Sequence, residues 1–160
     1  MSKCFAVFLL AAGWMVTAAA AKAEITCQSV ADEVASKGPK AAVADLFNRG
    51  NGDWASFIKQ VAAGHDDCIQ AAAVLHPGSD AGSSEDIIYG LSQALQENPA
   101  KVLGVVGGDI DIIRVCSDRT LEGTDEQHTL FVQHATAALS HIQDPRLIER
   151  RDACVALLKR

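Results

Sequence analysis

Helix start and stop signals recur at short intervals from residue 27 to the C terminus, and they constrain the fold more than any other feature. Gly38-Pro39 and Asn98-Pro99 are typical of one helix ending and the next beginning, because proline suits the first position of a helix. No segment shows the sustained alternation of a strand. The sequence predicts an all-α fold of roughly eight or nine short helices. These helices would form a compact orthogonal bundle or an irregular α-solenoid.

Residues with capping side chains predict where further helices begin. The predicted caps are Thr124, which has Gln127 at the capping-box spacing, and Asp53, Asp66, Asp109 and Asp144. Residues 77–84 are predicted to form a loop, after which Ser83 or Ser84 opens a helix. Residues 102–106 suit a buried strand by composition, but the preceding Asn-Pro favours a helix. The predicted starts are unequally spaced, which does not support a regular repeat.

Residues 1–23 are typical of a secretory signal peptide of bacterial type. Lys3 supplies the positive charge, an apolar run follows from Phe5 to Ala21, and Ala21-Lys22-Ala23 has the small-x-small cleavage pattern. An uncleaved membrane anchor is the alternative, but a spanning helix needs about 20 apolar residues and this run is shorter. We expect cleavage before Glu24. The product would be a single all-helical domain, residues 24–160, in the periplasm or secreted, without stable membrane insertion.

Four cysteines remain after that cleavage, namely Cys27, Cys68, Cys116 and Cys154. An even number of cysteines in an exported chain predicts two disulfides. Their wide spacing argues against a structural zinc site and against a C-x-x-C redox motif. Three pairings are possible. Because neighbouring helices tend to pack together, Cys27–Cys68 with Cys116–Cys154 is favoured.

The charge of the chain is unevenly distributed. The formal net charge is −6, which argues against nucleic acid as a partner. The segment from Asp66 to Glu126 contains 12 acidic side chains and only three basic ones. This excess is explained either by a well-solvated surface or by an acidic face for a basic partner protein. The candidate partner-binding residues are Asp80, Glu85, Asp86, Asp109, Asp111, Asp118 and Glu122.

Side chains capable of chemistry are present, but their spacing favours structural roles. His65-Asp66-Asp67 could bind a metal or transfer a proton, yet the same residues suit the start of a helix. His134 and His141 are two helical turns apart, about 10 Å, which is too far to share one zinc ion. Residues 80–86 lack the pattern of a calcium loop. We expect no catalytic residue, no metal ligand and no cofactor.

The sequence therefore predicts a non-catalytic exported protein-binding module. Its acidic surface would engage a basic partner, as an immunity protein or an inhibitor does. The alternative is a carrier of a small molecule or metal ion, with His65 or His134 lining a pocket between helices. An enzyme that uses the His65-Asp66-Asp67 cluster is the third hypothesis.

Overall fold

The computed structural model describes residues 25–50, 52–117 and 123–160, and within these ranges the chain is helical and contains no strand. The predicted all-α class is confirmed, and residues 102–105 belong to a helix rather than a strand, with Val106 as its C-cap. The predicted signal peptide and the candidates Asp118 and Glu122 lie outside the described residues.

The described residues form nine α-helices and one 3-10 turn. The first are α1 (Cys27–Lys37), α2 (Pro39–Asn48), α3 (Asp53–Ala62), α4 (Asp66–Leu75) and the turn η1 (His76–Gly78). They are followed by α5 (Ala81–Ala94), α6 (Pro99–Val105), α7 (Ile112–Val115), α8 (Asp125–Ser140) and α9 (Ile148–Leu158).

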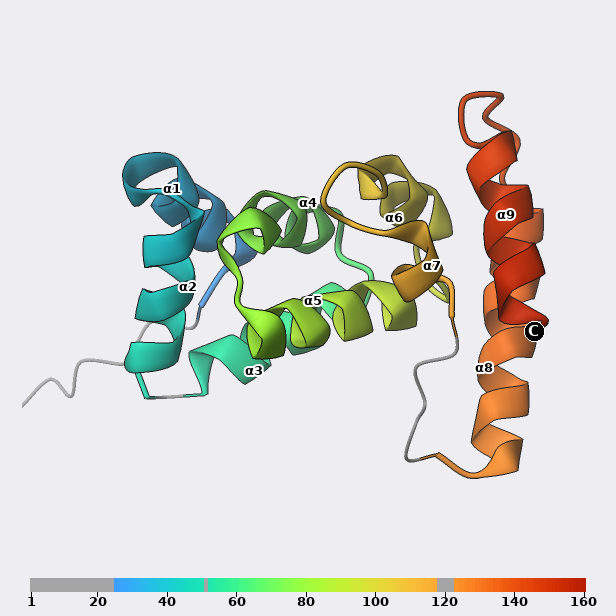
Figure 1. Ribbon diagram of the computed structural model, residues 1–160, viewed down its shortest axis with the longest axis horizontal. Coiled ribbons are helices and arrows are strands. Elements are labelled where there is room, and N and C mark those ends of the chain that lie inside the picture. The colour runs from blue at the N-terminus through green and yellow to red at the C-terminus, as the bar shows by residue number, and fades with distance from the viewer. Residues whose placement is uncertain (1–24, 51, 118–122) are drawn as a thin grey trace, which may run out of the picture.

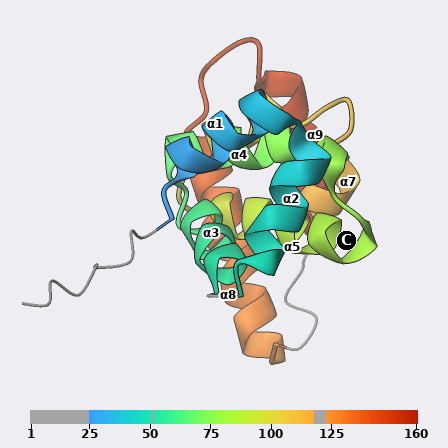
Figure 2. The same ribbon diagram turned by 90° about the vertical axis from the view of Figure 1, so that its left-hand side faces the viewer.

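The helices form two rows that are closed at both ends (Figure 1). Helices α3 and α5 pack against each other in one row, and α4 and α6 lie in the other. At one end α1 and α2 cross the rows, as Figure 2 shows from that side. At the other end α8 and α9 form an antiparallel pair that contacts the rest through α6 and α7.

The apolar core lies between the two rows. Its largest fully buried side chains come from α1 to α6 and α8, and include Phe57, Ile69, Ile88, Leu103 and Leu139. Gly90 lies where α5 packs against Ile58 and Val61 of α3. An added Cβ there would lie 3.2 Å from Val61 Cγ1, so the absence of a side chain permits this approach. Burial of such a core supplies the main driving force for folding.

Two disulfides fasten the two ends of the molecule. Cys27–Cys68 joins α1 to α4, and Cys116–Cys154 joins the end of α7 to α9. The favoured pairing of sequence neighbours is confirmed. All four cysteines are almost fully buried, so each bridge is part of the core.

Three predicted helix starts are confirmed. Pro39 and Pro99 occupy the first turns of α2 and α6. Thr124 accepts a hydrogen bond from the Gln127 backbone, and the Gln127 side chain accepts one from the Thr124 backbone in return. These signals are local, which is why the sequence reveals them.

Other predicted starts are wrong by a few residues. Asp53 and Asp66 are the first residues of α3 and α4 and cap neither helix. Helix α5 begins at Ala81, within the predicted loop, because Asp80 and Ser83 form a reciprocal capping box. Asp111, not Asp109, caps α7.

The last helix also begins later than predicted. Helix α9 starts at Ile148, and its N-cap residue, Leu147, provides no side-chain cap. The carboxylate of Asp144 instead accepts hydrogen bonds from the backbone and guanidinium groups of Arg146. Asp144 therefore stabilises the turn that precedes the helix.

Candidate functional site

An acidic stripe with one aromatic residue runs along the outward side of α5. Glu85 and Asp86 precede Tyr89 by four and three residues, so all three lie on one face of the helix. The opposite side of α5 is buried through Ile87, Ile88 and Leu91. Tyr89 keeps 45% of its surface exposed, although it is large and partly apolar. We call Glu85, Asp86 and Tyr89 the α5 ridge.

Each carboxylate of the ridge is held by a neighbouring element. The indole Nε1 of Trp54, on α3, donates a hydrogen bond of 2.7 Å to Asp86. The guanidinium of Arg114, on α7, pairs with Glu85. Because both contacts are charge-assisted, they limit the rotamers of the two acids. Both carboxylates of the ridge therefore have a partner on a neighbouring helix.

A shallow hollow of about 420 Å³ lies beside the N-terminal end of α5. It is lined by residues of η1, of the loop that follows, of the first turns of α5, and by Asp109. Two of the candidate acids, Asp80 and Asp109, are among these lining residues. Hydrogen bonds from the Ser83 hydroxyl and backbone to Asp80 lower the pKa of this carboxyl, which keeps it ionised.

A buried histidine forms one wall of this hollow. His76 is only 8% exposed, and its Nε2 lies 3.1 Å from the hydroxyl oxygen of Ser84. Its Nδ1 is buried and has no hydrogen-bond partner among the described residues. Burial and the nearby cation of Arg114 lower the pKa of His76, against the opposing effect of Asp109. His76 is therefore neutral at pH 7.

Arg114 connects the hollow to the α5 ridge. Its Nη1 donates a hydrogen bond of 3.3 Å to the Ser84 hydroxyl oxygen, while Nη2 pairs with Glu85. The side chains that surround His76 thus come from η1, α5, α7 and the segment before α7. Residues up to 38 positions apart in the sequence meet here only because the chain folds.

The structure brings some of the predicted partner-binding acids close together. Asp80 and Asp109 share the hollow, Glu85 is linked to it through Arg114, and Asp86 lies one residue further along α5. Asp111 has a local role, since its carboxylate accepts a hydrogen bond of 2.9 Å from the Ile113 backbone. The placement of Asp118 and Glu122 lies outside the described residues.

The side chains of His65, Asp66 and Asp67 do not share a common partner. Asp66 accepts a hydrogen bond of 2.6 Å from the Asn98 amide and lies 3.8 Å from Lys101 Nζ. Asp67 accepts one of 3.0 Å from the Cys68 backbone. His65 is exposed at the N-cap position of α4 and makes no capping bond with its side chain. These residues join α4 to α6 and secure the start of α4.

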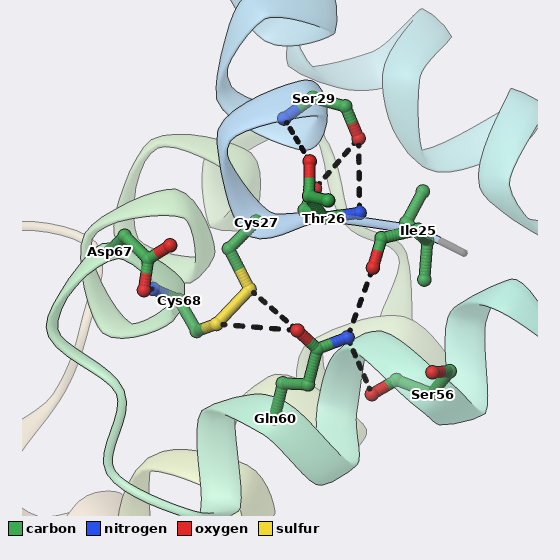
Figure 3. Close-up of a disulfide and its surroundings, with 8 residues drawn as sticks. All are labelled: Ile25, Thr26, Cys27, Ser29, Ser56, Gln60, Asp67 and Cys68. Atoms are coloured by element: carbon green, nitrogen blue, oxygen red, sulfur yellow. Dashed lines mark hydrogen bonds between the residues drawn. A yellow bond between two sulfur atoms is a disulfide. The ribbon is translucent and has the colours of Figure 1, made fainter. Parts of the chain in front are cut away.

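One group within the described residues has the proximity expected of metal ligands. Ligand-type atoms of Cys27, Asp67 and Cys68 lie within 4.8 Å of one another (Figure 3). The two sulfurs are joined in a disulfide, however, so neither is available as a thiolate. In the oxidised protein this group is a covalent link between α1 and α4.

The Gln60 side chain packs beside this disulfide and fixes the N-terminal end of α1. Its Oε1 lies 3.6 Å from Cys27 Sγ and 3.9 Å from Cys68 Sγ. A disulfide sulfur carries no proton, so these approaches are van der Waals contacts. The Gln60 Nε2 donates hydrogen bonds to the carbonyl oxygens of Ile25 and Ser56.

Several residues of this site were not predicted. Tyr89 could have been found from its helical spacing to Glu85 and Asp86. His76, Ser84 and Arg114 could not, because the sequence contains no motif that links them. The carrier hypothesis named His65 and His134, but both are exposed, and the histidine that lines the hollow is His76.

Two further observations bear on the class of protein. Among the described residues, no helix has both the length and the apolar character required to cross a bilayer. Comparison with protein-family models, with curated proteins and with solved structures found no match.

Proposed function

We propose that this chain is an exported module that binds a partner protein through the α5 ridge. The partner would carry a basic surface, and the module would act in the periplasm or outside the cell as an immunity protein or inhibitor does. The observation that carries the proposal is the exposure of Tyr89 one helical turn from two carboxylates that neighbouring helices hold. Tyrosine is enriched at interface centres, where it supplies contact area at a small entropic cost.

The acids around the ridge would determine which partner binds. Asp80 and Asp109 extend the negative surface beyond the N-terminal end of α5. Complementary charge accelerates encounter and disfavours partners of the wrong sign. The disulfides support an oxidising compartment as the site of action, since such bonds persist there.

Site-specific photocrosslinking tests this proposal. A benzoylphenylalanine replaces Tyr89 in one form of the protein and Gln133, which is exposed on α8, in another. After expression in the periplasm and irradiation, we expect one discrete crosslinked species from position 89 and none from position 133. Neutralising the ridge with Glu85→Gln and Asp86→Asn should reduce its yield about tenfold, which corresponds to about 1.4 kcal/mol of binding free energy.

A matched control separates the ridge from the total charge of the protein. Asp125→Asn with Glu126→Gln removes the same number of charges from the first turn of α8, and both residues are exposed. This control should leave the yield at position 89 unchanged. Equal yields from positions 89 and 133, or equal losses in the two charge variants, would contradict the proposal.

A further inference from the structure

Three elements converge on the hydroxyl of Ser84. His76 of η1 places Nε2 at 3.1 Å from the hydroxyl oxygen, and Arg114 of α7 donates a hydrogen bond of 3.3 Å to the same oxygen. Ser84 itself is on α5, one turn beyond the N-cap Asp80. The serine also lines the hollow, so a molecule bound there would lie next to this hydroxyl.

The two contacts have different chemical consequences. A guanidinium can only donate, so Arg114 occupies a lone pair of the Ser84 oxygen. In the tautomer that carries its proton on Nδ1, a neutral His76 has a lone pair on Nε2 that can accept the Ser84 proton. A base on the proton and a cation beside the oxygen both favour the developing alkoxide, which is how a serine hydroxyl is activated.

We propose that Ser84 is an activated nucleophile, with His76 as its general base, that accepts acyl groups from small esters bound in this hollow. A hollow of about 420 Å³ is within the size range of small-molecule sites. Because the carboxylates of Asp80 and Asp109 line it, the preferred ester carries a cationic group. This activity goes beyond partner binding and does not depend on it.

The reaction requires only the ester, water, the Ser84 and His76 side chains of the hollow, and Arg114 beside them. The Ser84 oxygen attacks the ester carbonyl carbon while its proton moves to His76 Nε2. The attack forms a tetrahedral intermediate, and the positive charge of Arg114, whose Nη1 lies 3.3 Å from the Ser84 oxygen, favours the negative charge that develops in this step. The intermediate then collapses, the bond to the leaving alcohol breaks, and that alcohol takes the proton from His76. Water releases the acyl group by the same steps in reverse order.

The groups around His76 keep it in the form that such a base requires. Arg114 of α7 disfavours the imidazolium, Asp109 favours it, and Glu85 reduces the influence of Arg114 by pairing with it. Asp80 lies across the hollow, and Lys40 is at the start of α2, which packs on η1. Burial is the largest influence and Arg114 adds to it, so the pKa of His76 lies below its usual value of 6.5.

Labelling with an alkyl fluorophosphonate tests the nucleophile directly. In this reaction the Ser84 oxygen bonds to phosphorus, the P–F bond breaks, fluoride leaves and the proton passes to His76. We expect a single adduct, located by peptide mass spectrometry at Ser84 and absent from Ser84→Ala. Ser140→Ala is the matched control, because Ser140 is exposed and its hydroxyl donates only to the nearby Ala137 carbonyl.

Separate measurements test the role of His76 as the general base. His76→Gln retains hydrogen-bonding capacity but cannot accept the proton, so the labelling rate should fall at least about 100-fold. In the wild-type protein this rate should decline with acidification, with a midpoint below pH 6.5. Near-ultraviolet circular dichroism checks that each variant is folded. A p-nitrophenyl ester with an ammonium group should be hydrolysed faster than one with a carboxylate.

Several results would overturn the proposal. The first is no adduct on the folded wild-type protein, and the second is an adduct at another residue. A labelling rate that does not depend on pH between 4 and 8 would exclude His76 as the base. Nitrogen NMR of the wild-type protein adds a test that needs no variant. Base catalysis requires the His76 proton on Nδ1, so a neutral imidazole with its proton on Nε2 would also overturn the proposal. These outcomes are independent of the crosslinking result at Tyr89.

Discussion

Gly78 shows how strictly one position can be determined by its neighbours. It ends η1, which packs directly against the start of α2. A Cβ added to Gly78 would lie 2.6 Å from the Pro39 carbonyl oxygen, and closer still to the Pro39 carbonyl carbon and the Lys40 nitrogen. These are backbone atoms at the first turn of a helix, so they cannot rotate away.

We therefore predict that Gly78→Ala destabilises the oxidised protein by about 1–3 kcal/mol, the usual cost of overpacking. Gly104→Ala is the matched control. Gly104 is within α6 and an added Cβ meets nothing within 4 Å, so alanine should raise stability by up to about 1 kcal/mol. Urea denaturation measures both changes, and equal midpoints for the two variants would refute this account of Gly78.

The α8–α9 pair is the element with the fewest connections to the rest of the molecule. It contacts the remaining helices mainly through α6 and α7, and Cys116–Cys154 is the covalent link at that end. At the other end, Cys27–Cys68 joins α1 to α4, which also pack against each other extensively. The two bridges therefore secure different elements.

This difference predicts where each bridge protects the backbone. The bridged residues are 41 and 38 positions apart, so the chain-entropy model assigns about 4 kcal/mol to each bridge. Cys116→Ala with Cys154→Ala should remove hydrogen-exchange protection first from α8 and α9. Cys27→Ala with Cys68→Ala, the matched control, should remove it first from α1. Loss of protection at the same amides in both variants would argue against this assignment.

At the scale of the whole molecule, stability should depend on pH in two separate ranges. The pKa of His76 is lowered by burial and by Arg114, so the unfolded chain binds a proton there before the folded chain does. The pKa of Asp144 is lowered to about 2, chiefly by hydrogen bonds from the Arg146 side chain. The pKa of Asp80 is lowered by its hydrogen bonds with Ser83.

When folding lowers the pKa of a group, the free energy of unfolding falls as the pH drops from the pKa of the unfolded chain to that of the folded chain. Over this range the unfolded chain binds the proton more strongly than the folded chain does. The free energy of unfolding should therefore fall as pH drops below about 6.5, through His76. It should fall again between about pH 4 and 2, through Asp144. His76→Gln should remove the first decline and leave the second. Urea denaturation at a series of pH values measures both, and a first decline retained in His76→Gln would exclude His76 as its origin.

The sequence was informative where a signal is local. The prolines at positions 39 and 99 and the Thr124 capping box identified helix starts, because a first turn depends on a few adjacent residues. The predicted pairing of the cysteines was also correct, although each bridge joins helices that are not consecutive, α1 with α4 and the end of α7 with α9. Prediction failed at Asp53 and Asp66, where a capping residue type occupies the first turn itself.

The candidate site could be predicted from the sequence only in part. Composition identified an acidic region, and the structure places Asp80 and Asp109 of that region in one hollow. Composition could not separate these residues from Asp111, whose carboxylate is used within its own turn. Whether an acid forms a local cap or a shared surface depends on backbone geometry that its residue type does not encode.

The sequence by itself determined the helical class, because amphipathic spacing and caps act over short stretches of chain, and its even number of cysteines indicated two disulfides. Only the tertiary structure decided that a buried histidine, a serine and an arginine from η1, α5 and α7 meet at one hydroxyl. It also decided that Tyr89 lies exposed one helical turn from two carboxylates that neighbouring helices hold. Both arrangements depend on how the packed rows of helices bring distant residues together, and that packing is a property of the whole core rather than of any segment.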